Sequence, residues 1–168
     1  MKLKLLSLSL LAASILSCKD SDPKASAFVD LSSYIWVKDV SGRNLLNKAT
    51  PGYLDSSKIR IFYDIEGKET EYYSPNLDAP YGFQVQKYEP NGEYYLWVVA
   101  SPYQPSVTYI KWPSGDEDTL SCSLIRSKHI FVVDEVYWNG IEKFKNKDPN
   151  RQENWGTKAF GRFFEVIK

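Results

Sequence analysis

The sequence is poor in the residues that most often carry catalysis or bind transition metals. Its 168 residues include two cysteines, Cys18 and Cys122, and one histidine, His129. A zinc site built from Cys and His is therefore short of ligands, and a Ser-His-Asp or Cys-His nucleophile would have to use His129. Cys122 alternates with Leu120 and Leu124. This alternation predicts a small, buried apolar side chain on the inner face of a strand, not a nucleophile.

An excess of charge of either sign is also missing. The 21 Lys and Arg residues balance 21 Asp and Glu residues, and loss of Lys2 and Lys4 with an N-terminal leader would leave a net charge of about −2. No basic patch stands out along the chain. Binding of nucleic acid or of anionic lipids therefore has no electrostatic basis, and no nucleic-acid partner is expected.

The chain also lacks an apolar run that could cross a bilayer. Residues 5–16 are apolar and uncharged and follow two lysines, but a transmembrane helix needs roughly 20 residues. Such a run is typical of a secretion signal. It ends in Ile15-Leu16-Ser17-Cys18, which resembles a bacterial lipobox. The resemblance implies removal of residues 1–17 and lipidation of Cys18, and an ordinary secretion signal with a chance cysteine is the alternative.

Residues 18–27 are polar and contain Pro23, which predicts a flexible tether. Lys19-Asp20 resembles the acidic export signal of surface lipoproteins in Bacteroides-type bacteria. Lipid on Cys18 would hold the domain at the outer membrane of a Gram-negative bacterium. The sequence leaves open whether the domain lies on the cell surface or on the inner face of that membrane. Cys122 is then the one remaining thiol, so an intramolecular disulfide is excluded.

Residues 28–168 are predicted to form a single, all-β domain. Strand-forming residues are broken at short intervals by Gly, Pro and Asn, with hairpin turns expected at 89–92 and 113–116. About eight strands at this spacing predict an antiparallel β-sandwich or a small barrel. The stretch 93–100 is apolar on both faces and should be a central strand, whereas 145–161 reads as a long polar loop. The strand-like runs are 34–40, 58–65, 68–73, 83–88, 93–100, 107–112, 118–125, 129–138 and 162–168.

Four short stretches carry a resemblance to known proteins. They are VKDVSGRNLLN (37–47), TPGY (50–53), TYIKWPSGDEDTL (108–120) and YWNG (137–140). With these stretches the chain resembles small uncharacterised lipoproteins of Bacteroides-type bacteria over nearly the whole mature domain. The resemblance implies a secreted all-β domain on a lipid tether, and it brings no catalytic residues with it.

The same stretches can be interpreted as structural. Gly42 and Gly115 suit turns with positive φ, and the carboxylate of Asp116 or Asp118 is expected to bind turn amides. The acidic run 115–119 offers oxygens to calcium but matches no complete calcium loop, so a solvated turn is expected. A glycosidase would need two carboxylates about 5–9 Å apart across a cleft, and no motif singles out such a pair. No catalytic residue, metal or cofactor is therefore predicted.

Aromatic residues make up 15% of the chain. Trp36, Tyr63 and Trp97 lie in strand-like runs and are predicted to belong to the core. Three others lie in loops that contain Pro or Gly and are the candidate ligand-binding residues: Tyr81, Tyr103 and Trp155. Exposed aromatic rings stack on sugars or anchor a protein partner, and the alternative is that these rings fold over the sheet ends as lids.

The sequence thus predicts a non-catalytic, lipid-anchored envelope module for binding or assembly, with a protein or a glycan as partner. Loop aromatics that gather at one place would favour a glycan, and a large, flat apolar patch would favour a protein. A small hydrolase that uses a carboxylate pair is the alternative function. A deep cleft with two neighbouring acids of shifted pKa would favour that alternative.

Overall fold

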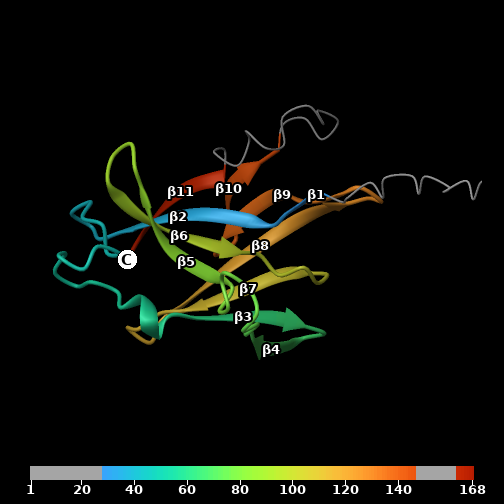
Figure 1. Cartoon of the computed structure of the whole chain (residues 1–168), viewed down its shortest axis with the longest axis horizontal. Helices are drawn as coiled ribbons and strands as arrows, with labels where there is room; N and C mark the ends of the chain where they lie inside the picture. The colour runs from blue at the N-terminus through green and yellow to red at the C-terminus, as the bar shows by residue number, and fades with distance from the viewer. Residues whose placement is uncertain (1–27, 147–161) are drawn as a thin grey trace, which may run out of the picture.

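The computed structural model of this chain describes residues 28–146 and 162–168, and this part of the chain is nearly all β. Its eleven strands form two sheets (Figure 1). One core cluster unites residues of both sheets. The leader 1–17, the tether 18–27 with Cys18, and Trp155 lie outside the described residues.

The larger sheet has seven strands. They are β1 (Phe28–Asp30), β3 (Arg60–Ile65), β4 (Lys68–Glu71), β7 (Ser106–Lys111), β8 (Glu117–Arg126), β9 (Ile130–Trp138) and β10 (Ile141–Lys145). Their order is β1-β9-β8-β7-β3-β4, and β10 also pairs with β9. β1 pairs with the first residues of β9 and β10 with its last residues, so β4 alone forms the opposite edge.

The smaller sheet has four strands. They are β2 (Ser32–Lys38), β5 (Phe83–Tyr88), β6 (Glu93–Val99) and β11 (Phe163–Ile167). Their order is β11-β2-β6-β5, which confirms β6 as a central strand. Neither sheet closes on itself, so of the two predicted architectures the sandwich is confirmed and the barrel is wrong.

The fully antiparallel pairing predicted from the sequence is wrong at two places. β1 runs parallel to β9, and β11 runs parallel to β2. Each of these pairs joins segments far apart in the chain, so no hairpin turn signals it. Arg162, which directly precedes β11, binds the last residue of β1: its guanidinium donates to the Asp30 carbonyl oxygen at 3.1 Å and forms an ion pair with the Asp30 carboxylate.

The two predicted hairpins are confirmed, and further hairpins join β3 to β4, β8 to β9 and β9 to β10. The turn at 89–92 joins β5 to β6, and the turn at 113–116 joins β7 to β8. β1 and β10 are strands that the residue pattern does not predict. β10 follows Asn139 and Gly140, which both have positive φ (49° and 78°) and so match the twist of a tight hairpin.

The core lies between the two sheets. Alternate residues of each strand point into it, and burial of such a side chain contributes roughly 1.5–3 kcal/mol. The smaller sheet supplies residues that are fully buried, and the larger sheet supplies the residues opposite them: Ile35, Val37, Leu96 and Val98 from the first, and Ile61, Ile110, Leu120 and Val136 from the second.

The predicted core position is correct for Tyr63, which is 3% exposed, but wrong for Trp36 and Trp97. Both tryptophans alternate with inward-facing residues of β2 and β6, so they lie on the outer face of the smaller sheet. The cause is that both faces of this sheet carry large apolar residues. Period-two alternation separates the two faces but does not tell which of them meets the other sheet.

Candidate functional site

A pocket lined largely by tyrosine opens beside the second halves of β3 and β4, and we call it the tyrosine pocket. Its volume is about 210 Å³. It draws on the hairpin of β3 and β4, on the segment that follows β4, and on the connection from β6 to β7. The lining residues are Tyr63, Ile65, Thr70, Glu71, Tyr72, Tyr73, Pro102 and Tyr103.

The loop 72–82 carries two exposed rings beside this pocket. Backbone bonds close it, from Ser74 N–H to the Pro80 carbonyl at 2.7 Å and from Gly82 N–H to the Ala79 carbonyl at 2.9 Å. The rings of Tyr73 and Tyr81 lie 5.1 Å apart, measured between their centroids, and are tilted by 38°. They therefore form one aromatic surface although eight positions separate them in the sequence.

Gly82 ends this loop where no other residue fits without strain. Its φ is +76°, and a Cβ atom there would lie 2.9 Å from Cδ1 of Tyr72. The missing side chain lets Tyr72 pack against the backbone, and the two rings of Tyr72 and Tyr63 lie 4.9 Å apart. The floor of the pocket thus depends on a glycine in the loop that carries its rim.

Tyr63 forms the buried floor. Its hydroxyl donates to the Val99 carbonyl at 3.0 Å, which ties the larger sheet to the smaller one. Burial raises the pKa of Tyr63, and the neighbouring Tyr72 and Tyr103 raise it further. The phenol is therefore a neutral donor, and its role is structural.

Tyr103 stands on a loop that internal hydrogen bonds hold in place. Ser101 N–H donates to the Thr108 hydroxyl at 2.8 Å, and the Ser106 hydroxyl donates to the Ser101 carbonyl at 2.6 Å. Arg126 donates to the carbonyl of Pro102 at 2.9 Å. The ring of Tyr103 is thus presented from a fixed backbone.

Two of the three predicted ligand-binding residues, Tyr81 and Tyr103, are connected through Tyr73. Tyr103 lines the pocket with Tyr73, and Tyr73 contacts Tyr81. The exposed fractions of Tyr73, Tyr81 and Tyr103 are 59%, 44% and 45%, so they are not lids folded onto the core. Sequence reasoning missed Tyr73 because it placed 68–73 in one strand. The signal was the break after Tyr73, at Ser74-Pro75-Asn76.

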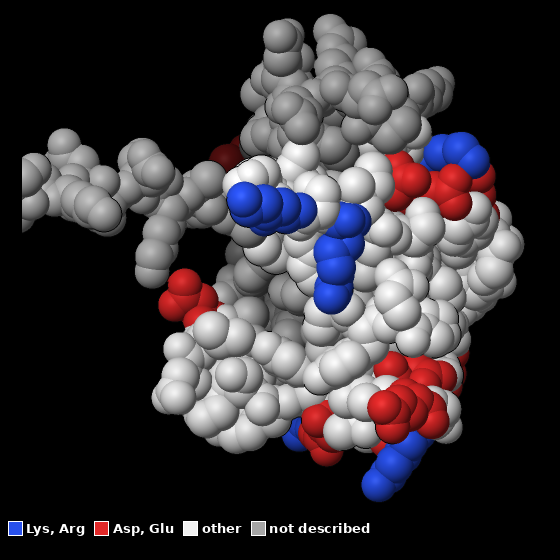
Figure 2. Space-filling model, turned by 90° about the vertical axis from the view of Figure 1, so that its right-hand side faces the viewer, with Lys and Arg blue, Asp and Glu red and all other residues white. Residues whose placement is uncertain are grey.

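Charged groups stand beside the rings. The Arg60 guanidinium lies 5.7 Å from the centroid of Tyr81, and its Nε lies 3.6 Å from a carboxylate oxygen of Glu71. Figure 2 looks onto the side of the molecule toward which β3 runs. Most of the described surface there is uncharged, and the charged side chains lie in a few small groups that include both signs. The site therefore offers rings, hydrogen-bonding groups and no strong field of one sign.

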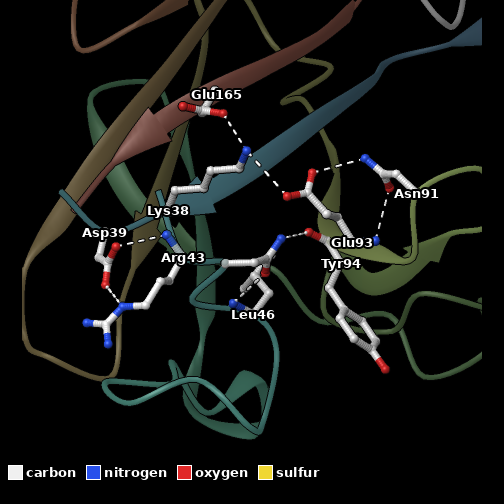
Figure 3. A network of polar contacts seen from close by, with 9 residues as sticks. Lys38, Asp39, Arg43, Leu46, Asn91, Glu93, Tyr94 and Glu165 are labelled. Atoms are coloured by element: carbon white, nitrogen blue, oxygen red, sulfur yellow. Dashed lines mark hydrogen bonds and ion pairs between the residues drawn. The ribbon is translucent and has the colours of Figure 1, made fainter. Parts of the chain in front are cut away.

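The first resembling stretch, 37–47, builds a loop instead of a site. Oδ1 of Asp39 accepts two backbone N–H groups of its own loop at 2.9 Å, and Oδ2 accepts Arg43 Nε at 2.6 Å (Figure 3). Asn44 donates to the Tyr94 carbonyl at 2.6 Å and accepts the Leu46 N–H at 2.9 Å. This loop is therefore attached to β6, and the motif is accounted for structurally.

The third and fourth resembling stretches, 108–120 and 137–140, meet around Asp118. Its Oδ2 accepts the indole N–H of Trp112 at 2.7 Å, and its Oδ1 accepts the side-chain amide of Asn139 at 2.7 Å. The Lys168 ammonium pairs with both Asp118 and Asp116. Asp118 therefore binds side chains, not the turn amides that were expected. Gly42 and Gly115 do have the predicted positive φ, 77° and 91°.

Neighbouring carboxylates in this structure share a lysine. Three such sets are present: Glu69 and Glu117 at Lys111, Glu93 and Glu165 at Lys38 (Figure 3), and Asp116 and Asp118 at Lys168. The cation beside the 115–119 run is thus a side chain of this chain. In the two described ranges, no group of three or more His, Cys, Asp and Glu side chains is gathered as a metal ion requires.

A carboxyl group that acts as general acid needs a raised pKa. Among the described carboxyl groups, Asp134 has one, because burial raises its pKa and the neighbouring Glu135 raises it further. Asp134 lies on β9 and does not line the tyrosine pocket. This acid thus lies away from the candidate site.

Cys122 and His129 do not form a pair. Cys122 faces Val136 across β8 and β9, whereas His129 is exposed in the turn before β9. Burial raises the pKa of the Cys122 thiol to about 12, against the opposing effect of Arg162. The thiol is thus protonated at neutral pH and packs against the core, partly buried, as the alternation predicts.

Comparison with known proteins gives no matching family model, no matching curated protein and no matching solved structure. None of the described residues belongs to a helix long and apolar enough to cross a membrane.

Proposed function

We propose that this chain is a non-catalytic lipoprotein of the bacterial envelope that binds a glycan at the tyrosine pocket. One observation carries the proposal. Tyr73 and Tyr103 line one pocket from two separate loops, Tyr81 packs against Tyr73, and all three rings are about half exposed. An aromatic ring has an apolar face for the C–H side of a sugar, and a tyrosine adds a hydroxyl for the polar side.

The dimensions of the site favour a glycan over a protein partner. A pocket of about 210 Å³ is below the usual range for drug-sized ligands, about 300–1,000 Å³, and suits one small unit of a chain. A protein partner would require a flat surface of roughly 800 Å². Thr70 and Glu71 line the pocket beside the rings, and their oxygens suit the hydroxyl groups of a sugar.

The envelope location is supported by residues 1–27. The apolar run, the lipobox-like Ile15-Leu16-Ser17-Cys18 and the polar tether are the pattern of a lipid-anchored protein. The resemblance to small lipoproteins of Bacteroides-type bacteria agrees with it. Lipid on Cys18 would place the binding domain at the outer membrane, where glycans are accessible to it. Cys18→Ser should abolish lipid labelling in cells.

The mature chain from Cys18 should be tested in detergent by isothermal titration against a panel of plant, host and bacterial glycans. We expect the double variant Tyr73→Ala/Tyr81→Ala to bind the preferred glycan at least about tenfold more weakly, since stacking contacts are lost. Its melting temperature should stay unchanged because both rings are exposed.

Tyr137→Ala is the matched control. Tyr137 lies on β9, three strands away from β3 in the larger sheet, and does not line the pocket. Binding in this variant should equal that of the unmodified chain. An absence of binding to every glycan would contradict the proposal and favour a protein partner. Release of shortened products from the bound glycan would instead favour the hydrolase.

A further inference from the structure

The outer face of the smaller sheet carries six aromatic residues, and five of them hold one another. Phe163 lies at their centre, stacked on Tyr34 at 4.5 Å and 14° and within 5.6 Å of three further rings, all measured between centroids. The five are Tyr34, Trp36, Tyr88, Tyr95 and Phe163. Their mutual contacts account for their presence outside the core.

Trp97 is the sixth ring and is not accounted for in this way. Within the described ranges it has no ring partner, and its indole N–H has no hydrogen-bond acceptor. This N–H is not sealed from solvent, unlike that of Trp36, which is buried without a partner. A tryptophan that packs neither in the core nor in the cluster leaves one ring face and one donor available.

Trp97 lines a groove of about 260 Å³ together with Tyr34, Gln86 and Ser32. Tyr34 lies directly opposite Trp97 across β2 and β6, so the two rings are neighbours on one face. Phe163 fixes the Tyr34 ring from one side by stacking on it. Two rings and two hydrogen-bonding side chains therefore surround one open space.

Gln86 is held so that it keeps capacity for a ligand. Its Oε1 accepts the Tyr95 hydroxyl at 2.7 Å, and its Nε2 donates to Gln84 Oε1 at 2.7 Å. A side-chain amide has two donor hydrogens and two acceptor lone pairs. One donor and one acceptor thus remain on a side chain whose orientation is already set. None of the described residues that line this groove carries a charge.

We infer that this groove is a second subsite, for an uncharged sugar unit, in which Trp97 provides the stacking ring and Gln86 the hydrogen bonds. The inference rests on the proposed glycan-binding function. Gln84, the direct neighbour of Trp97 on β5, donates to the carbonyl of Asp78 at 2.6 Å. The loop that carries Tyr73 and Tyr81 therefore reaches the border of the groove, and the ligand class is an oligosaccharide.

The test uses the mature chain, with the indole N–H signals followed by NMR. The Trp97 signal is assigned through Trp97→Phe. A soluble paramagnetic agent should broaden it, and should leave the Trp112 signal sharp because Trp112 is 3% exposed and its N–H is bound to Asp118. A Trp97 signal that stays sharp would show that the groove is covered, and would overturn the inference.

Four neutral hexasaccharides then serve as probes, made of α-1,4-glucose, β-1,4-glucose, β-1,4-xylose and β-1,4-mannose. We expect one of them to shift the Trp97 signal, and Trp97→Ala to weaken its binding about tenfold. Tyr109→Ala, on the outer face of the larger sheet, is the control and should bind normally.

The outcomes separate the two proposals. Loss of binding in Tyr73→Ala/Tyr81→Ala with normal binding in Trp97→Ala would overturn the second subsite and leave the proposed function standing. Weaker binding in both variants would support both proposals. If none of the four probes binds the unmodified chain, the second subsite for a neutral oligosaccharide is overturned, and the glycan panel decides the proposed function separately.

Discussion

The two ends of the sandwich differ in whether their side chains are paired within the chain or exposed. One end, which we call the closed end, holds Asp39, Asn44, Asp118 and Lys168, and their charged and polar groups pair within the chain. The other end holds the tyrosine pocket, where large rings remain about half exposed. In Figure 1 the closed end lies on the left, beside the C-terminus, and β3 runs away from it.

This difference between the two ends indicates which of them is the better candidate for a binding site. The stretches that carry the resemblance, with their Asp, Asn, Gly and Trp residues, look chemically rich. These residues stabilise the end of the sandwich, because each carboxylate and side-chain amide there already has hydrogen-bond partners within the chain. The exposed rings of Tyr73, Tyr81 and Tyr103 at the other end have no comparable structural use, which is why we propose that they bind a ligand.

The largest loss of stability is expected at the closed end, from Asp118→Ala. The change leaves the Trp112 indole, the Asn139 amide and the Lys168 ammonium without their shared partner. Because the buried Trp112 indole loses its acceptor and the Lys168 ammonium loses one of its two carboxylates, the free energy of unfolding should fall by about 3 kcal/mol. Urea unfolding measures it.

Glu142→Ala is the control for this change. Glu142 is exposed on β10 and makes no ion pair among the described residues, so no measurable loss of stability is expected. Glycan binding at the tyrosine pocket should survive Asp118→Ala under folded conditions. If Asp118→Ala and Glu142→Ala lower the free energy of unfolding by the same amount, the closed end does not have the structural role given to it.

A smaller effect is expected at the pocket end, from Gly82→Ala. A Cβ atom at this position would meet the Tyr72 ring at 2.9 Å, on a backbone with φ of +76°. We expect a loss of about 2 kcal/mol in the free energy of unfolding and weaker glycan binding, because Tyr72 must move. Thermal unfolding and titration with the preferred glycan measure the two effects.

Gly67→Ala separates contact from backbone strain. Gly67 has nearly the same φ, +79°, but a Cβ atom there would meet nothing within 4 Å. It should cost only about 1 kcal/mol and leave binding intact. Equal losses for the two variants would mean that the Tyr72 contact does not matter, and that the floor of the pocket is not fixed by Gly82.

Much of the fold could be predicted because its signals are local. Alternation along β3, the apolar run of β6 and the turn residues at 89–92 and 113–116 are properties of short segments, and they predict the right strands. β1 could not be found in this way. It has three residues, and its pairing with β9 depends on a segment far along the chain.

The site was only half predictable for a similar reason. Tyr81 and Tyr103 stand out because Pro or Gly next to them marks a loop. Tyr73 follows a strand without a break, and Trp97 lies inside one, so a local pattern assigns both to regular structure. Which face of β6 meets the other sheet depends on the packing of the whole domain, and this decides that Trp97 is available to a ligand.

The smallest expected effect is a dependence on pH at the closed end. Burial acts to raise the pKa of Asp116, but the hydrogen bonds from Lys168 and Ser114 outweigh it and lower this pKa below its ordinary value of 3.8. A lowered pKa in the folded state means that the carboxylate stabilises the fold above pH 3.8, and that this contribution is lost as the pH falls through the folded-state value.

Asp116→Asn should therefore make the acid branch of the stability curve shallower, and added salt should reduce the difference since Asp116 is partly exposed. Urea midpoints measured from neutral to acid pH decide it, with Glu142→Gln as the control that should leave the curve unchanged. An acid branch that is equally steep in Asp116→Asn would mean that the Lys168 ammonium is held by Asp118 alone, and the closed end would then rest on one carboxylate instead of two.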